Sequence, residues 1–146
     1  MPKINLKIIT PEKLVYEGVV SEFYAFTQTG KIGVLPMHVP LVTVLKPGEM
    51  IIKKDGVDLP MAVSGGILEV RPSLNISGEF VTPVVILVDH LEFAQDIDLE
   101  KSKAAYERAK KAMEEKSNLL DVDFARLQAK IEKELNRVKI GSKYRK

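Results

Sequence analysis

Residues 30–48, GKIGVLPMHVPLVTVLKPG, decide how the first part of the chain folds. The stretch is largely apolar, but its glycines and three prolines exclude a long helix. Proline removes a backbone donor and favours extended geometry in the residue before it. The stretch therefore predicts short extended pieces joined by tight turns, with His38 held between Pro36 and Pro40. Such a segment is either buried in β-structure or presented as a contact surface.

The residues on either side of this stretch, from 3 to 89, follow a period of two. Ile4, Leu6 and Ile8 alternate with polar residues, which is typical of a half-buried strand. Asp55-Gly56 separates two further runs and predicts a hairpin with a type I′ turn, while Pro60 predicts an edge strand or a bulge in its second arm. Seven to ten short strands, the last at 84–88, favour a small β-sandwich or barrel.

From Asp98 the apolar residues recur at helical spacing instead. Asp96 and Asp98 are suited to cap the first helix and to interact with its dipole. A second helix is expected to start at Asp123 as N-cap and to end before Gly141, with Lys139 near its negative end. The predicted inner faces are Leu99, Ser102, Ala105, Tyr106, Ala109, Ala112 and Met113, and then Phe124, Leu127, Ile131, Leu135 and Val138.

The expected fold class is therefore α+β: an N-terminal antiparallel β-sandwich followed by a C-terminal α-helical hairpin. The net charge changes sign between these parts, from −3 over residues 1–97 to +5 over residues 98–146. The first helix has mainly alanine on its inner face, and alanine buries little apolar area. We expect a hairpin that depends on docking and can leave its dock at modest cost.

Composition and motifs argue against most catalytic functions. The chain has no cysteine, no secretory signal and no apolar run of the roughly 18 residues that a membrane span needs, which favours the cytoplasm. No phosphate-binding Gly-rich loop occurs, Ser64 lacks the first glycine of a nucleophile elbow, and two histidines supply a catalytic triad poorly. Glutamates interleave with the helical cations, which disfavours nucleic-acid binding. Asp89, His90 and Glu92 lack a second cluster that would complete a metal site.

Several motifs resemble, in the same order, those of the ε subunit of F-type ATP synthases. The matching segments are ITPE with VYEG (9–12 and 15–18), GVLPMHVPLVT (33–43), SGGILEV (64–70) and the helix entry QDID (95–98). Two departures are a longer connection over residues 71–83 and Met37 in place of a common small residue.

This resemblance implies a ten-stranded sandwich over residues 1–89 that binds the rotor, and a mobile regulatory helical pair over residues 90–146. Partners would be the γ subunit, the c-subunit ring, and the α and β subunits, and the subunit would be peripheral on the cytoplasmic face of the cell membrane. It would have no catalytic residues, and its helices would inhibit ATP hydrolysis when extended. The implied rotor-binding residues are Lys31, Pro36, Met37, His38, Val39 and Pro40.

Some bacterial members of the family bind ATP as a regulatory ligand, although no cofactor is required. The corresponding residues here are Glu92, Ile97, Asp98, Lys101, Arg108, Lys133 and Arg137. Lys101 and Lys133 stand where arginines are usual. Lysine keeps the charge but loses the planar fork that binds phosphate in a bidentate manner.

Two other functions are compatible with the residues alone. A free-standing binding or scaffold module would not co-purify with membrane ATPase subunits, and a small hydrolase would turn over substrate as an isolated chain. The sequence leaves open whether the helices rest folded or extended.

Overall fold

The computed structural model describes residues 3–115 and 120–144. The chain divides into two compact units, Met1–Glu92 and Phe93–Lys146. The first unit is built of strands and the second mainly of helices.

Eleven strands of the described residues form one hydrogen-bonded network in the order β11-β7-β6-β3-β5-β8-β10-β1-β2, with β4 beside β3 and β9 beside β10. The strands are β1 (Ile4–Ile9), β2 (Leu14–Val20), β3 (Glu22–Thr27), β4 (Gly30–Val34), β5 (Leu41–Leu45), β6 (Gly48–Lys54), β7 (Val57–Val63), β8 (Gly66–Val70), β9 (Ser73–Leu74), β10 (Phe80–Val88) and β11 (Leu91–Phe93). The number exceeds the expected seven to ten because β9 and β11 are too short to show a period of two.

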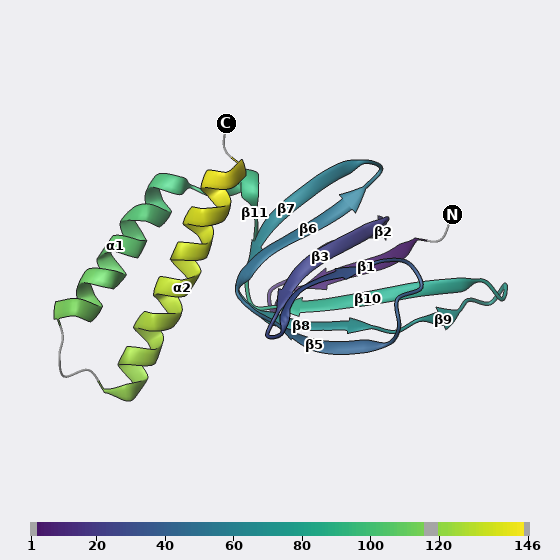
Figure 1. Cartoon of the computed structure of the whole chain (residues 1–146), viewed down its shortest axis with the longest axis horizontal. Coiled ribbons are helices and arrows are strands. Elements are labelled where there is room, and N and C mark those ends of the chain that lie inside the picture. Colours follow the sequence, from purple (N-terminus) through teal and green to yellow (C-terminus); the bar gives the residue numbers. More distant parts are fainter. Residues whose placement is uncertain (1–2, 116–119, 145–146) are drawn as a thin grey trace. The chain divides into compact units, whose positions relative to one another are not determined.

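The network folds into two layers with an apolar core between them. Figure 1 shows β6 and β7 lying over the layer that contains β1, β10 and β8. The fully buried side chains include Ile4, Leu6, Ile8, Phe23, Met50, Ile52, Met61, Leu68 and Ile86. The expected sandwich is therefore confirmed. One pairing, β1 with β10, is parallel, which a period of two cannot reveal because it is the same in both directions.

Strand β10 is longer than the apolar run that predicted it. It begins at Phe80 and not at Val84, and alternate residues from Thr82 to Val88 are buried. The polar Thr82 concealed the start of the strand in the sequence. Its hydroxyl is satisfied inside the fold, because it accepts a hydrogen bond of 2.8 Å from the backbone N–H of Met37.

The hairpin of β6 and β7 has the predicted turn. Asp55 and Gly56 have φ angles of 50° and 77°, as both central residues of a type I′ turn require. Pro60 pairs with Ile51 in a ladder that shows no register shift, so there is no bulge here. The other neighbour of β7 is the three-residue β11, which leaves β7 close to the edge of the sheet and explains why proline is tolerated.

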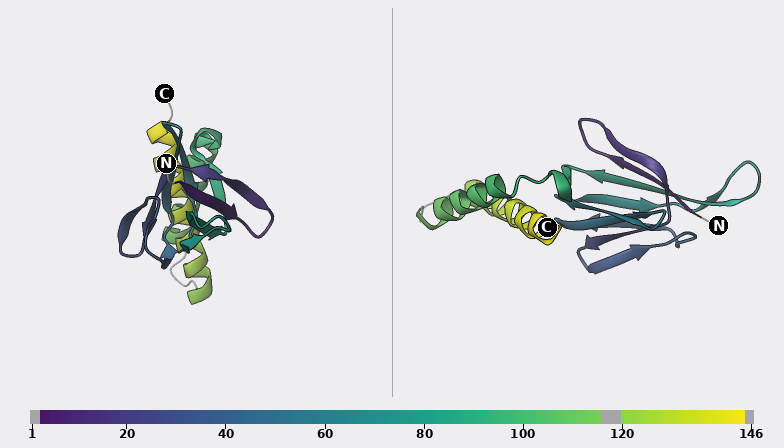
Figure 2. Two further views of the ribbon diagram at one scale, coloured as in Figure 1. Left: turned by 90° about the vertical axis from the view of Figure 1, so that its right-hand side faces the viewer. Right: turned by 90° about the horizontal axis from the view of Figure 1, so that it is seen from above.

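The second unit contains the short 3-10 helix η1 (Ala94–Asp96) and two α-helices, α1 (Leu99–Glu115) and α2 (Asp121–Tyr144). The helices lie side by side as a hairpin (Figures 1 and 2). Ser102, Ala105 and Ala109 are the buried residues of α1, which confirms a seam of small side chains. The Ser102 hydroxyl is fully buried and has no hydrogen-bond partner in the part of the chain that the structure describes.

The starts of both helices differ from the expectation. Asp98 does cap α1, but Asp96 belongs to η1. The helix α2 begins at Asp121, two residues before the expected cap Asp123, because the N–H of Phe124 already bonds to the carbonyl of Leu120 at 2.9 Å. Of the turn expected at 117–123, residues 117–119 lie outside the described residues.

Gly141 does not end α2. The helix continues to Tyr144, with Lys143 and not Lys139 in its last turn. A Cβ at Gly141 would lie 3.1 Å from Cγ2 of Ile97 and 3.4 Å from Cδ1 of Leu99. The glycine therefore serves the close approach of α2 to the start of α1, which the sequence alone cannot distinguish from a helix end.

Candidate functional site

The predicted rotor-binding loop connects β4 to β5 and is held by hydrogen bonds. The N–H of His38 donates to the carbonyl of Leu35 at 3.1 Å and closes a turn around Pro36 and Met37. Met37 has a positive φ of 67°, and its N–H is the donor to Thr82 in β10. A non-glycine residue in this conformation costs of the order of 1–3 kcal/mol, which the surrounding contacts must offset. The loop is thus a defined turn fastened to the neighbouring strand.

This loop presents apolar side chains to solvent. Met37 is 58% exposed and Val39 is 68% exposed. His38 is half-buried, with its Nδ1 2.7 Å from the carbonyl oxygen of Val39. Lys31 is exposed at the far end of β4, where its ammonium lies 5.4 Å from the ring centroid of Tyr24. An exposed apolar turn on a stiff scaffold is suited to contact with a partner protein.

A second apolar feature belongs to the ribbon formed by β9 and β10, which projects beyond the other strands (Figures 1 and 2). Asn75 and Glu79 close its tip through two hydrogen bonds of 2.9 Å. Leu74, Ile76 and Phe80 are exposed along it. The unusual length of this connection was visible in the sequence, but the exposure of its apolar residues required the structure.

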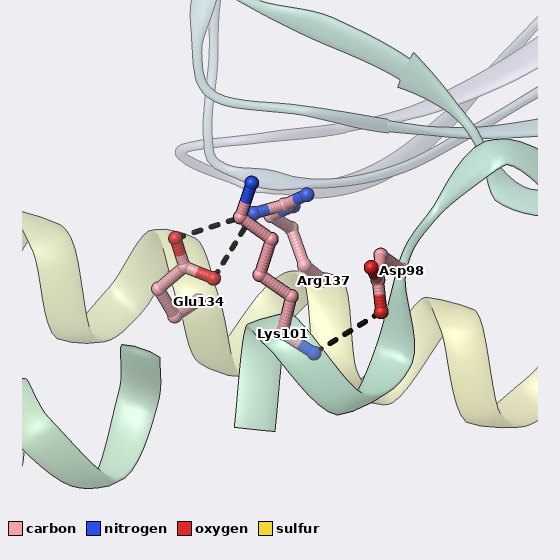
Figure 3. A network of polar contacts seen from close by, with 4 residues as sticks. All are labelled: Asp98, Lys101, Glu134 and Arg137. Atoms are coloured by element: carbon pink, nitrogen blue, oxygen red, sulfur yellow. Dashed lines mark hydrogen bonds and ion pairs between the residues drawn. The ribbon is translucent and has the colours of Figure 1, made fainter. Parts of the chain in front are cut away.

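Three of the predicted nucleotide residues, Asp98, Lys101 and Arg137, lie near one another at the start of α1 (Figure 3). A carboxylate oxygen of Asp98 accepts a hydrogen bond of 3.1 Å from the backbone N–H of Lys101, which is the geometry of a helix N-cap. Ile97 is buried, and the close approach to Gly141 shows that it packs against α2. Asp98 and Ile97 therefore have structural roles that hold this corner of the hairpin together.

Arg137 of α2 lies beside this corner and is paired with Glu134. Its Nη1 is 3.3 Å and 3.2 Å from the two carboxylate oxygens of Glu134. The side chains of Arg137 and Glu134 are only 18% and 8% exposed. In the sequence Glu134 is one of the glutamates that interleave with the helical cations, and its burial required the structure. Its spacing of three from Arg137 was the available signal, since residues three apart are neighbours on a helix.

The remaining predicted residues are spread over α1, α2 and β11. Lys133 is half-buried one turn before Arg137 on α2, whereas Arg108 is exposed two turns beyond Lys101 on α1. Glu92 lies in β11, within the first unit. The structure thus brings Asp98, Lys101, Glu134 and Arg137 together (Figure 3), while Arg108 lies further along the hairpin.

Cations next to a helix N-terminus are suited to binding an anion. Within residues 3–115 and 120–144, no three His, Cys, Asp or Glu side chains are grouped so that they could hold a metal ion. Neither of the two described α-helices is long and apolar enough to cross a membrane.

Two protein-family models match two separate parts of the chain. Residues 3–77 match the β-sandwich domain of the ATP synthase Delta/Epsilon chain, and residues 95–141 match its long α-helix domain. The ATP synthase epsilon chain of Halalkalibacterium halodurans is 36% identical over 144 residues, which are 98% of this chain and all of that protein. The epsilon chain of Brevibacillus brevis is 43% identical over 122 residues, which are 83% of this chain and 86% of that protein.

A similar fold occurs in a chain of the cryo-EM structure of Euglena gracilis mitochondrial ATP synthase, OSCP/F1/c-ring in rotational state 1. The TM-score is 0.73 at 21% identity, and the match covers 93% of this chain and 79% of that chain. The family models match most of the sandwich and most of the helical pair in the observed order, and the bacterial relatives align over most of their length. This chain therefore belongs to the ATP synthase delta/epsilon chain family, as an epsilon chain of the bacterial F-type.

Proposed function

We propose that this chain is the central-stalk ε subunit of an F-type proton-translocating ATP synthase, where it couples rotor rotation to ATP synthesis and restrains ATP hydrolysis. Membership of the epsilon-chain family supports this function over a free-standing scaffold or a small hydrolase, because epsilon chains are non-catalytic subunits of the synthase. The subunit would be peripheral on the cytoplasmic face of the cell membrane, attached through the complex.

Residues 1–89 would form the rotor-binding domain, with the γ subunit and the c-subunit ring as partners. Its contact residues would be Lys31, Pro36, Met37, His38, Val39 and Pro40. The exposed apolar turn at Met37 and Val39 supports this assignment, because its hydrogen bond to Thr82 gives the turn a defined shape before any partner binds.

Residues 90–146 would form the regulatory domain, which acts on the α and β subunits. The observation that carries this proposal is the seam between α1 and α2, where the buried residues of α1 are Ser102, Ala105 and Ala109. Such small side chains contribute little apolar burial, so a change in the packing of this pair costs little. The positive charge of this part of the chain is suited to acidic surfaces on partner subunits.

Deletion of residues 98–146 tests the regulatory role in the assembled synthase. We expect ATP hydrolysis to rise while the complex still assembles. Lys130→Ala with Lys133→Ala should reproduce much of this rise, whereas Lys103→Ala with Lys110→Ala, which removes two exposed lysines from α1, serves as the charge-matched control. Unchanged hydrolysis in the deletion variant would overturn the braking role.

ATP is the proposed regulatory ligand. It would bind weakly, and its binding would favour the folded state of the hairpin. The arrangement of Asp98, Lys101 and Arg137 at the start of α1 supports an anion site there. Lys101→Arg with Lys133→Arg should tighten binding, by roughly tenfold or more for each restored charge-assisted contact. Calorimetric titration of the full chain with ATP measures this, with Lys103→Arg as control. Tight binding by the native chain, or no gain in the double variant, would contradict the proposal.

A further inference from the structure

The pair formed by Glu134 and Arg137 lies inside the candidate anion site and places a carboxylate group there. Both carboxylate oxygens of Glu134 are within hydrogen-bond distance of one nitrogen, Nη1 of Arg137. The pair is largely buried, with Glu134 only 6% exposed. A carboxylate so little exposed is stabilised mainly by its cationic partner, because it has lost most of its contact with water.

A phosphate group uses the same donors as a carboxylate. Guanidinium nitrogens bind both groups through charge-assisted hydrogen bonds of similar geometry. A phosphate that reached Nη1 of Arg137 would meet the Glu134 carboxylate at the same atom. A phosphate and a carboxylate that share one nitrogen atom repel each other. Glu134 would also lose its cationic partner without gaining full exposure to water.

We propose that Glu134 is an internal competitor for the anion site, whose carboxylate occupies Arg137 and must be displaced before a phosphate group of ATP can bind. This inference rests on the proposed role of ATP as regulatory ligand. Glu134 would then lower the affinity for ATP in addition to Lys101 and Lys133, which stand where arginines are usual in the family. The consequence is a site that responds only to high concentrations of nucleotide, because each binding event must also break an existing ion pair.

The test replaces the carboxylate and keeps the shape of the side chain. Glu134→Gln should tighten ATP binding by the full chain about tenfold, since the neutral amide no longer repels the phosphate and holds Arg137 less strongly than the carboxylate does. Glu132→Gln is the matched control. Glu132 is an exposed glutamate on α2 only two residues away, so this variant changes the net charge equally but should leave the affinity unchanged.

A second comparison shows whether the effect passes through Arg137. In an Arg137→Gln background, Glu134→Gln should give no further gain, because the donor for which the two anions compete is absent. Affinities are measured by calorimetry with ATP, and the thermal shift produced by ATP gives an independent readout that should be larger in Glu134→Gln than in the native chain.

The outcomes separate the two proposals. If the native chain binds ATP and Glu134→Gln binds it no more tightly, the proposed competition is overturned but the ATP site is not. The same holds if Glu132→Gln raises the affinity for ATP as much as Glu134→Gln does. A gain that persists in the Arg137→Gln background would also overturn the competition. Absence of binding by every variant at millimolar ATP would overturn the ATP site itself, and the competition with it.

Discussion

The sandwich and the helical hairpin bury side chains of very different size. The sandwich encloses Phe23, Met50, Ile52 and Ile86 without exposure, and burial of each such side chain contributes about 1.5–3 kcal/mol. The deeply buried residues of α1 are one serine and two alanines. The sandwich is therefore a scaffold with its own core, whereas the hairpin is held together by the close approach of its two helix backbones and by few large apolar side chains.

The largest effect should come from the scaffold. Phe23→Ala removes a fully buried ring from β3, and we expect a loss of about 3–5 kcal/mol in the free energy of unfolding because a cavity remains. Urea denaturation of the full chain measures it. Phe26→Ala, at a partly exposed ring three residues later on the same strand, should cost clearly less. Equal losses at both positions would contradict a single core between the layers.

A smaller effect should come from crowding the hairpin. Gly141→Leu adds a side chain where side-chain carbons of Ile97 and Leu99 lie 3.1 Å and 3.4 Å from the place that a Cβ would take. We expect α1 and α2 to lose about 1–3 kcal/mol of local stability, since overpacking forces backbone shifts. Hydrogen exchange of the two helices measures the loss, and β1 and β10 should keep their protection. Loss of protection throughout the sandwich would show that the two regions do not unfold separately.

A substitution at the seam between α1 and α2 should increase the local stability of the hairpin. Ser102→Ala removes a fully buried hydroxyl that has no partner among the described residues, and an unpaired buried polar group costs about 1–3 kcal/mol. We expect slower hydrogen exchange in α1 and, in the assembled synthase, higher ATP hydrolysis if the folded hairpin is permissive. Ser142→Ala, at an exposed serine of α2, controls for helix propensity. Destabilisation by Ser102→Ala would show that the hydroxyl has a partner in solution.

The smallest effect on stability should be at the rotor-binding loop. His38→Ala with Lys31→Glu alters a half-buried and an exposed side chain, and the cation–π contact of Lys31 with Tyr24 contributes only about 0.5–1 kcal/mol. The melting temperature should therefore change little, while attachment to the stalk in a reconstitution assay weakens. A large fall in melting temperature would mean that the loop supports the scaffold and does not serve a partner.

Local patterns in the sequence determined the class of each region. The alternation of Ile4, Leu6 and Ile8 predicted a buried strand face, Asp55-Gly56 predicted the type I′ turn, and Asp98 predicted the cap of α1. These features depend on neighbours a few residues apart, so propensity and periodicity are sufficient to reveal them. The motifs around His38 and at residues 64–70 also carried the resemblance to the family that the comparisons confirm.

Tertiary contacts decided what the patterns left ambiguous. The parallel pairing of β1 with β10 joins segments distant in the sequence, and no local period records its direction. From the sequence, Gly141 was expected to end a helix. In the structure a glycine is favoured there because a Cβ would lie close to the side chains of Ile97 and Leu99. The sequence did not distinguish Glu134 from the other glutamates of the helices, but the structure buries it beside Arg137. Burial and pairing of this kind are set by residues far apart in the chain, because the cost of removing a charge from water depends on what surrounds it in the folded state.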